Sequence, residues 1–404
     1  MKWYKRGHEF DEMEEYYKNT KEIYFYGAVQ SAEPYIEELE RAIREANDGI
    51  LDINISFVDR SIEKQRNLLC GKKVNSPQVF YEEFFNKSAL TVLCIAEDRA
   101  QEVWEQMKQH GIKRKQHAFT AYDFFKYLSL FIWYRYKKTY LYMIDIFAHT
   151  LCNLNCKHCF VQTYRGVRKQ ADITNMKHII DVIFNKIDFL EKGYFGIAEG
   201  FLGGGVFEEA FNYIVKNYSK KFNEIQVVTN GTIIPQQSLI EILKHKQVRV
   251  IVDDYRDNVK LARENYSKVI QILEKNDIRY ESLKRPNWDE SCFGERRTVE
   301  NVEQLCNKVG ECNCHAKGFP YIGYKEGTTR MYSCVFHAIN TYLNLIEEHD
   351  DDSLDFATAT PLEIIEFLLG FSEKGYLSAC AYCNGMFEGI EVNHVPVAVQ
   401  LENL

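Results

Sequence analysis

Proline is scarce in this chain of 404 residues, with 7 copies, and glycine is moderate at 22. These counts exclude a fibrous or linker-rich architecture. Positive charge is also in deficit, because 50 Lys and Arg face 58 Asp and Glu, for a formal net charge of −8. This balance argues against general electrostatic binding of nucleic acid. The sequence contains no internal repeat and no low-complexity tract.

Long apolar runs are missing as well. The first residues, Met-Lys-Trp-Tyr-Lys-Arg-Gly-His, lack the apolar stretch of a signal peptide. The most hydrophobic stretch, Tyr127–Ile146, is interrupted by Arg135, Lys137 and Lys138. It therefore cannot supply the ~18–20 uncharged residues of a membrane-spanning helix. We expect a cytoplasmic protein that does not enter a membrane.

Apolar and sulfur-bearing side chains are abundant. Hydrophobic residues make up 46% of the chain and aromatic residues 14%, which is too much for a disordered protein. Among the 12 cysteines, all but Cys70 and Cys94 follow residue 150, and many lie at short spacings. Without a secretion signal, clustered thiols favour metal binding over disulfide bonds.

Residues 1–122 have the pattern of a small doubly wound domain. Strands are predicted over residues 23–26, 51–58 and 89–95, and helices over 33–46 and 99–110. We interpret this pattern as βαβαβ. Gly27 stands alone where a dinucleotide-binding fingerprint has three glycines. We therefore expect this domain to position a substrate or a carrier rather than to bind NAD. Asp59, at the ribose-binding position, is more simply explained as a turn cap.

Residues 123–285 begin with an aromatic helix over 124–138 and continue as repeated βα units. The predicted strands cover residues 141–147, 193–202, 224–229, 249–252 and 279–283. The predicted helices cover residues 174–189, 207–218, 237–245 and 259–275. This alternation predicts a parallel sheet, either open or closed into a barrel. After Arg285 the alternation fails, and a cysteine-rich segment occupies residues 286–404.

A CxxxCxxC motif directly follows the first strand of these βα units. It consists of Cys152, Cys156 and Cys159. Three thiolates do not close a tetrahedral zinc site, whereas a [4Fe–4S] cluster on three thiolates keeps one iron open for another ligand. The alternative is a zinc knuckle completed by His158 or a further cysteine.

Polar and glycine-rich motifs follow the next three predicted strands. Gly203-Gly204-Gly205 stands at the end of the second, Thr229-Asn230-Gly231 at the end of the third, and Asp253-Asp254 at the end of the fourth. Barrel active sites form at the carboxyl ends of strands. The two carboxylates suit ribose or substrate hydroxyls, although a solvated pair at a helix start is an equal alternative.

With these motifs, the chain resembles the radical S-adenosylmethionine (SAM) superfamily from Leu141 to about Leu283. The resemblance implies a partial (β/α)6 barrel and a [4Fe–4S] cluster whose open iron binds SAM. One electron then cleaves SAM to methionine and a 5′-deoxyadenosyl radical, which abstracts hydrogen from the substrate. The resemblance also implies a set of SAM-pocket residues. They are Phe160 beside the adenine, the backbone of Gly203, Gly204 and Gly205, and the side chains of Thr229 and Asn230. Asp253 is added as a cofactor-binding candidate from its place at the end of the fourth predicted strand.

The glycine triplet departs from the family pattern. The family has Gly-Gly-Glu-Pro there, and Gly205 occupies the place of the glutamate that binds the SAM amino group. Backbone carbonyls can accept hydrogen bonds from an ammonium group. Glu199, Glu208 and Glu209 are the acids near enough in sequence to replace the missing carboxylate. Restoring the acid with Gly205→Glu is expected to be tolerated or to tighten SAM binding.

The C-terminal cysteines form a second group. Cys314 and Cys334 bracket a predicted hairpin, and Cys380-Ala-Tyr-Cys383 follows a helix predicted over 361–371. Four thiols at these intervals suit either a structural zinc or a cluster. The layout resembles the twitch domain, the short form of the SPASM domain, which implies an auxiliary [4Fe–4S] cluster. Two spare thiols, Cys306 and Cys312, lie close by, and Cys312 competes with Cys314 as a ligand.

The likeness to twitch-containing enzymes of aminocyclitols and sugars implies an oxidoreductase or an epimerase. Its substrate would be a carbohydrate-like or carrier-linked small molecule, and its electrons would come from a flavodoxin or ferredoxin. Cys292 is the candidate thiol that donates hydrogen to a substrate radical, although an ordinary loop cysteine is the simpler interpretation. The alternatives are a maturase of a ribosomal peptide, whose usual winged-helix domain is not predicted here, and a non-catalytic iron–sulfur or zinc scaffold.

Overall fold

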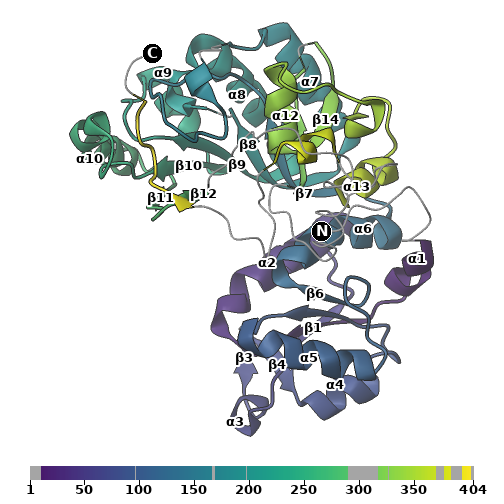
Figure 1. The fold of residues 1–404 in the computed structure, drawn as a ribbon. Helices are drawn as coiled ribbons and strands as arrows, with labels where there is room; N and C mark the ends of the chain where they lie inside the picture. The colour runs from purple at the N-terminus through teal and green to yellow at the C-terminus, as the bar shows by residue number, and fades with distance from the viewer. Residues whose placement is uncertain are drawn as a thin grey trace. The chain divides into compact units, whose positions relative to one another are not determined.

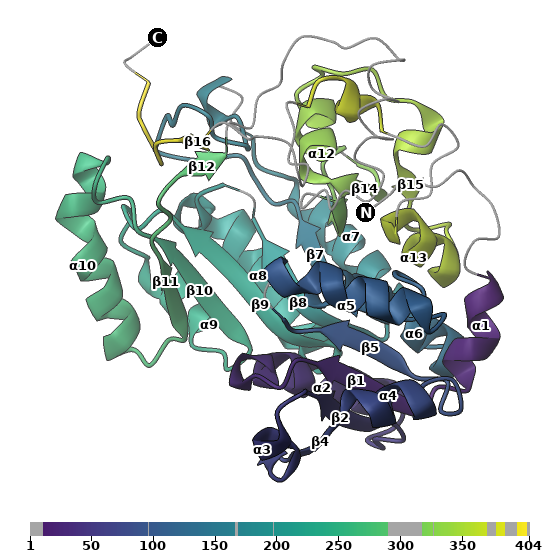
Figure 2. The same ribbon diagram turned by 60° about the horizontal axis from the view of Figure 1, so that its bottom comes forward.

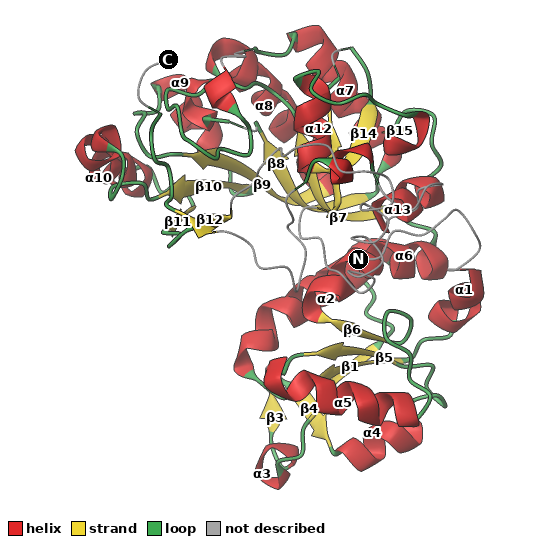
Figure 3. Ribbon diagram, in the orientation of Figure 1, coloured by secondary structure: helices red, strands yellow, loops and turns green. Residues whose placement is uncertain are grey.

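The computed structural model describes residues 11–95, 97–165, 169–196, 198–289, 317–325, 327–369, 377–383 and 394–401. The chain folds as two compact units, Gly7–Tyr140 and Leu141–Leu404, each built around one large sheet (Figures 1 and 3). The predicted α/β class is therefore confirmed. None of the described helices is long and apolar enough to cross a membrane.

The first unit contains a sheet of order β3-β4-β2-β1-β5-β6, which is parallel except for the β3–β4 pair. Tyr24 and Tyr26 of β1 pack against Phe80 and Met107, which come from the helices on one face. The strands are β1 (Glu22–Tyr26), β2 (Asn54–Val58), β3 (Leu68–Leu69), β4 (Lys72–Asn75), β5 (Leu90–Leu93) and β6 (Ala118–Thr120). The helices are α1 (Asp11–Lys18), α2 (Glu33–Ala46), α3 (Ile62–Gln65), α4 (Pro77–Glu83), α5 (Glu97–Gln109) and α6 (Ala121–Tyr136).

The turn after β1 is the tightest point of this unit. Gly27 has a φ of +102°, and a Cβ added there would lie 2.6 Å from Ile95 Cγ2 and 2.7 Å from the Cys94 carbonyl oxygen. Asp59 ties this turn to the one after β2, because its carboxylate accepts hydrogen bonds from the Ala28 amide (3.0 Å) and the Ser61 amide (2.9 Å). It also pairs with Lys64 at 2.9 Å. These contacts agree with a turn-capping role.

The second unit contains a sheet of order β11-β10-β9-β8-β7-β13-β14-β15. Strands β8 to β11 are parallel to their neighbours, β13 is parallel to β7, and β14 and β15 are antiparallel additions. The strands are β7 (Tyr140–Ile146), β8 (Phe189–Phe195), β9 (Phe222–Thr229), β10 (Val248–Asp253), β11 (Tyr280–Leu283), β13 (Lys317–Ile322), β14 (Arg330–Cys334) and β15 (Leu354–Asp355).

Helices α7 to α10 and α13 pack on one face of this sheet (Figure 2), and α12 packs on the other face against Tyr321 and Tyr332. Apolar side chains that alternate along the strands pack with α7 to α10, for example Ile225 and Val227 of β9 and Val250 and Val252 of β10. The helices are α7 (Ile173–Lys186), α8 (Gly204–Tyr218), α9 (Gln237–Leu243), α10 (Lys260–Lys275), α12 (Val335–Tyr342) and α13 (Pro361–Leu369). Alternate residues of a strand point to opposite faces, so the remaining side chains of β7 to β11 line the other face.

The second predicted strand of this unit was placed wrongly. We expected it over residues 193–202, but β8 covers Phe189–Phe195 and the preceding helix ends at Lys186 rather than at 189. Gly196, with a φ of +84°, turns the chain at the end of the strand. A short 3-10 helix, Gly200–Leu202, follows, and the glycine triplet then begins α8. The triplet therefore does not end the strand.

Replacement of Gly27 by alanine tests the close approach behind β1. We expect Gly27→Ala to lower the free energy of unfolding by about 3 kcal/mol, because it adds a clash with Cys94 and Ile95 to the strain of a positive φ. Gly71→Ala is the matched control, since Gly71 has a φ of +70° and open space around it; about 1 kcal/mol is expected there. Urea unfolding curves of both variants measure the difference, and equal losses would contradict the packing argument.

Candidate functional site

The thiols of the CxxxCxxC motif lie together in the loop after β7. Cys152, Cys156 and Cys159 all pack in one small cluster with Leu154 and Val259. Burial raises the pKa of the Cys152 thiol to about 11 and that of the Cys156 thiol to about 12. Buried thiols without a cation stay protonated, so metal binding at this loop would release their protons.

Hydrogen-bond donors surround these sulfur atoms. The Leu154 amide lies 3.4 Å from Cys152 Sγ, and Asn230 Nδ2 lies 3.7 Å from the same atom. Gln400 Nε2 lies 3.1 Å from Cys156 Sγ, and Thr163 Oγ1 lies 3.9 Å from Cys159 Sγ. Such N–H and O–H donors stabilise the negative charge of metal-bound thiolates.

The donor set fits a cluster. Among the described residues, no three His, Cys, Asp or Glu side chains converge closely enough to bind one metal ion. The thiolates of a [4Fe–4S] cluster each bind a different iron, so they need not converge on one point. Of the three thiols of the loop, Cys156 is buried and Cys152 and Cys159 are half-buried.

A buried carboxylate lies beside residues 152–159, which carry the CxxxCxxC motif and are called here the cysteine loop. Glu199, four residues beyond the end of β8, is only 1% exposed. It accepts hydrogen bonds from Thr229 Oγ1 (2.6 Å), the Asn230 amide (2.7 Å) and the Phe201 amide (3.0 Å). Burial nevertheless raises its pKa to about 7. Its charge interacts with the Cys152 thiol, so Glu199 belongs to the same site.

The end of β9 holds the cysteine loop in place. Asn230 donates from Nδ2 to Asn153 Oδ1 at 3.1 Å, and Asn153 donates in turn to Thr232 Oγ1 at 2.8 Å. Thr229 and Asn230 were both selected from sequence. Asn230 contacts Cys152 and Asn153, whereas Thr229 contacts Glu199.

Asp253, the last residue of β10, and Asp254, which follows it, have different surroundings. Asp253 accepts a hydrogen bond from Tyr255 (2.9 Å), and burial raises its pKa. Its other oxygen, Oδ1, makes no hydrogen bond within the described residues and lies 3.8 Å from Arg285 Nε. Asp254 instead pairs with the more exposed Arg256 at 2.7 Å. Since Tyr255 interacts electrostatically with Cys156 and Cys159, Asp253 is the aspartate that faces the site.

The glycine triplet has a different character. Gly203 is packed against Phe207, whereas a side chain added at Gly205 would meet nothing within 4 Å. Gly205 is exposed at the start of α8. Glu209 pairs with Lys177 at 2.6 Å, which leaves Glu199 as the acid bonded to Thr229 and Asn230. Sequence reasoning missed Glu199 because it placed the end of the strand at residue 202. The acid follows the strand only when β8 ends at Phe195.

Two further predicted residue sets are only partly placed. The Phe160 ring is 46% exposed beside Cys159, and it therefore has an open face. Cys334 ends β14, and Cys380 lies in the 3-10 helix Ser378–Ala381, with Cys383 just after it. Four predicted residues lie outside the described residues, namely Cys292, Cys306, Cys312 and Cys314.

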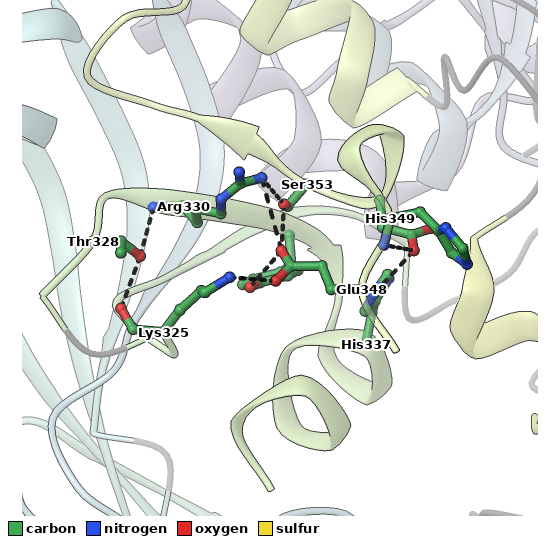
Figure 4. Close-up of polar contacts among 9 residues, drawn as sticks. Lys325, Thr328, Arg330, His337, Glu348, His349 and Ser353 are labelled. Atoms are coloured by element: carbon green, nitrogen blue, oxygen red, sulfur yellow. Dashed lines mark hydrogen bonds and ion pairs between the residues drawn. The ribbon is translucent and has the colours of Figure 1, made fainter. Parts of the chain in front are cut away.

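A polar network joins the segments that carry these C-terminal thiols (Figure 4). Glu348 accepts hydrogen bonds from Lys325 (2.7 Å), Tyr332 (3.1 Å) and Ser353 (2.7 Å). Asp352 lies 3.8 Å from His337 and accepts a hydrogen bond from the Ser378 amide at 2.8 Å. The network therefore connects the hairpin that ends at Cys334 to the helix that contains Cys380.

The face of the second sheet opposite α7 to α10 carries polar side chains that sequence reasoning missed. Asp145 of β7 accepts a hydrogen bond from Tyr324 at 3.0 Å, and burial raises its pKa to about 7. Lys192 lies 3.3 Å from the Tyr142 hydroxyl, and both residues interact electrostatically with Tyr194. The available signal was a charged residue inside each apolar strand, such as Asp145 between Ile144 and Ile146.

Comparison with known proteins gives a local sequence match. No family model matches the chain. Over 113 residues the chain is 30% identical to the antilisterial bacteriocin subtilosin biosynthesis protein AlbA of Bacillus subtilis (strain 168). The match covers 27% of this chain and 22% of AlbA, so the chain spans about a fifth of that relative.

Solved structures give more distant resemblances. anSMEcpe with bound AdoMet and the Cp18Cys peptide has 14% identity and a TM-score of 0.38, covering 56% of this chain and 80% of that one. BtrN in complex with AdoMet and 2-DOIA has 11% identity and a TM-score of 0.38, covering 61% and 94%. SuiB of Streptococcus suis bound to precursor peptide SuiA has 13% identity and a TM-score of 0.31, covering 82% and 78%. TM-scores below 0.5 establish no common fold, so these structures stand as resemblances only.

The raised pKa of Asp145 predicts a pH dependence of stability. Its carboxyl titrates near pH 7 in the folded chain and near pH 4 in the unfolded chain. Between these values the folded state binds the extra proton, so the free energy of unfolding falls as the pH rises from about 4 to about 7. Asp145→Asn is expected to remove this part of the loss. Urea unfolding at several pH values measures it, and parallel pH profiles for the two proteins would refute it.

Proposed function

We propose that this chain is a member of the radical SAM superfamily, which it resembles in its CxxxCxxC motif, and that it binds a [4Fe–4S] cluster through Cys152, Cys156 and Cys159 and cleaves SAM reductively. The observation that carries the proposal is the arrangement around these thiols. N–H donors contact the sulfurs, the buried Glu199 follows β8, and the half-buried Asp253 ends β10 in the same parallel sheet. The resemblance implies the cofactors, which are the cluster and SAM. A flavodoxin or ferredoxin is the proposed electron donor.

A reduced cluster with SAM on its open iron supplies the 5′-deoxyadenosyl radical that takes hydrogen from a substrate. The chain's own residues bind and orient SAM. Glu199 is the proposed acceptor for the SAM ammonium group, because it is the carboxylate at the end of β8 and already accepts from Thr229 and Asn230. Asp253 Oδ1, which makes no hydrogen bond within the described residues, is the proposed acceptor for a ribose hydroxyl. Phe160, with its exposed ring, is proposed to stack on adenine.

The proposal changes the assignment of the glycine triplet. Gly203, Gly204 and Gly205 begin a helix, so their backbone is proposed to contact SAM without needing an acid at Gly205. A buried ammonium group requires hydrogen-bond acceptors, since leaving it unpaired costs ~1–3 kcal/mol or more. Glu199 supplies the acceptor that seemed to be missing from the sequence.

The wider architecture is proposed to be that of an enzyme in three parts. Strands β7 to β11 with their helices form the partial (β/α)6 barrel, and the doubly wound first unit is Rossmann-like. The segment from 286 onwards is proposed to be a twitch-type domain. Its auxiliary [4Fe–4S] cluster would be bound by Cys314, Cys334, Cys380 and Cys383, with Cys292 as the candidate hydrogen-donating thiol.

Two substrate classes have specific support. The polar face of the second sheet, with Asp145, Lys192 and Tyr194, offers hydrogen-bond partners to a hydroxyl-bearing substrate. This favours the dehydrogenation or epimerisation of a carbohydrate-like molecule. The local match to AlbA, a bacteriocin biosynthesis protein, favours a ribosomal peptide as the substrate. The first unit is proposed to position either kind of substrate.

Iron content and SAM cleavage test the proposal. Anaerobic reconstitution should give about 8 Fe per chain for two cubane clusters. The triple variant Cys152→Ala, Cys156→Ala, Cys159→Ala should lose about half of the iron and all release of 5′-deoxyadenosine. The control Cys94→Ala removes a buried thiol of the first unit and should change neither.

The same assay separates the substrate classes. 5′-Deoxyadenosine release should increase with cyclitols and sugars if the substrate is carbohydrate-like, and with precursor peptides if it is a peptide. Stoichiometric zinc without iron after anaerobic preparation would refute the proposal.

The assignment of Glu199 predicts a difference between two variants. Glu199→Gln should weaken SAM binding about tenfold or more, because the carboxylate that accepts from the ammonium is lost. Gly205→Glu should leave SAM affinity unchanged, since Gly205 is exposed with open space around it. Isothermal titration of the reconstituted proteins with SAM measures both. Tighter binding by Gly205→Glu together with unaltered binding by Glu199→Gln would return the role to the glycine triplet.

A further inference from the structure

Residues 394–401, called here the C-terminal strap, run antiparallel to the cysteine loop. The Lys157 amide donates to the Val399 carbonyl at 2.7 Å, and the Leu401 amide donates to the Asn155 carbonyl at 2.8 Å. Between these bonds, Cys156 and Gln400 pair as a β-bridge. The strap thus forms a short added strand along the loop that contains the middle thiol of the motif.

Contacts on its other side anchor the strap to the second unit. Asn258, in the turn before α10, donates from Nδ2 to the Val397 carbonyl at 2.7 Å. Val397 and Ala398 are buried with Val259 in the same apolar cluster as the thiols. The start of the strap, His394–Val395 (β16), pairs with Trp288–Asp289 (β12). These contacts fix the position of Gln400 relative to the barrel strands.

The Gln400 amide has a defined orientation. Its Oε1 accepts a hydrogen bond from the Asn155 amide at 2.8 Å. Its Nε2 donates to the Ala398 carbonyl at 2.7 Å and to Cys156 Sγ at 3.1 Å. A flipped amide would place Nε2 against the Asn155 N–H and Oε1 against the Ala398 carbonyl, so the network itself selects the donor that faces sulfur.

We propose that the strap holds the cysteine loop, and that Gln400 is a positioning residue whose N–H···S bond to Cys156 raises the reduction potential of the bound cluster. This inference rests on the proposed function, which places Cys156 among the cluster ligands. It is distinct from that function, because Gln400 is 244 residues away in sequence from the thiol it contacts and lies outside the cysteine motif.

Electrostatics gives the direction of the effect. Reduction adds negative charge to a cluster and to its thiolate ligands. An N–H donor to one of these sulfurs stabilises the reduced form more than the oxidised form, and hydrogen bonds to sulfur are among the factors that set cluster potentials. Loss of the donor therefore makes the cluster harder to reduce.

The experiment compares two substitutions at one position. Gln400→Glu keeps an oxygen for the Asn155 amide but removes the N–H donor and adds negative charge. Gln400→Met has similar length and removes both polar atoms. Each should lower the ratio of reduced to oxidised cluster about tenfold at a given potential, which is a shift of about 59 mV to more negative values, and the shift should be larger for Gln400→Glu. EPR-monitored redox titration without SAM measures these potentials.

Asn258→Ala is the matched control. It removes an anchor of the strap at Val397 but leaves the sulfur contact, so the cluster potential should stay at the wild-type value. A purely structural strap would lower iron retention in all three variants without moving the potential of the cluster that remains. Unchanged potentials in both Gln400 variants at full iron content would overturn the inference while leaving the proposed function intact. A wild-type protein that binds no iron would refute the proposed function itself.

Hydrogen exchange in the iron-free protein provides a readout that does not depend on the cluster. The amides of Lys157 and Leu401 should exchange slowly in the wild type, because each donates to the paired segment. Gln400→Met should accelerate their exchange by tenfold or more. If the Gln400 variants fail to retain iron, hydrogen exchange tests whether the strap holds the cysteine loop. Fast exchange of both amides in the wild type would overturn this inference.

Discussion

The site depends on one buried carboxylate. Glu199 is almost fully removed from solvent, and a buried charge without partners is strongly destabilising. Three donors compensate for this cost, and two of them, Thr229 and the Asn230 amide, come from the end of the next strand. Asn230 then contacts the cysteine loop through Cys152 and Asn153. The residues after β8 and at the end of β9 are thereby connected to the loop that carries Cys152.

The second sheet separates stability from chemistry by its two faces. Alternate residues of β9 and β10 contribute valine and isoleucine to the core beneath the helices. Their neighbours along the strands place charged groups on the opposite face, where Arg249 pairs with Glu224 at 2.8 Å. Because a strand alternates sides with every residue, one sequence encodes both a dry core and a polar surface suited to a substrate. Asp145, with its raised pKa, is the most strongly perturbed carboxyl of that surface outside the cofactor site.

Segments from the end of the chain complete regions that begin much earlier. The strap supplies Gln400 to Cys156, and the Glu348 and Asp352 network links the β13–β14 hairpin to the helix of Cys380. Both are long-range contacts, which cost chain entropy to form and so require several bonds together. The strap makes two backbone hydrogen bonds with the cysteine loop in addition to the Gln400 contacts. Removal of the strap would thus affect the cysteine loop directly.

The sequence alone determined the α/β class and the boundaries of the strongly periodic helices, and it selected the thiols that we propose as cluster ligands. The helix predicted over 33–46 coincides with α2, and the one over 259–275 differs from α10 by one residue, because amphipathic periodicity is a local property. The spacing of Cys152, Cys156 and Cys159 likewise indicated a cluster without any structure. The end of β8 could not be found this way, since Phe189–Phe195 and the residues up to 202 are similarly apolar and only the positive φ of Gly196 ends the strand.

The position at which β8 ends decided which acid joins the site. With the strand extended to 202, Gly205 occupied the place of the acid and the carboxylate seemed to be absent; with the strand ended at Phe195, Glu199 reaches Thr229 and Asn230. The Gln400 contact was equally beyond sequence reasoning, because a lone glutamine near the chain end has no periodic or spacing signal. The cysteine motif follows from the order of residues along the chain, whereas the partners of its sulfurs depend on which distant segments the tertiary fold places beside them.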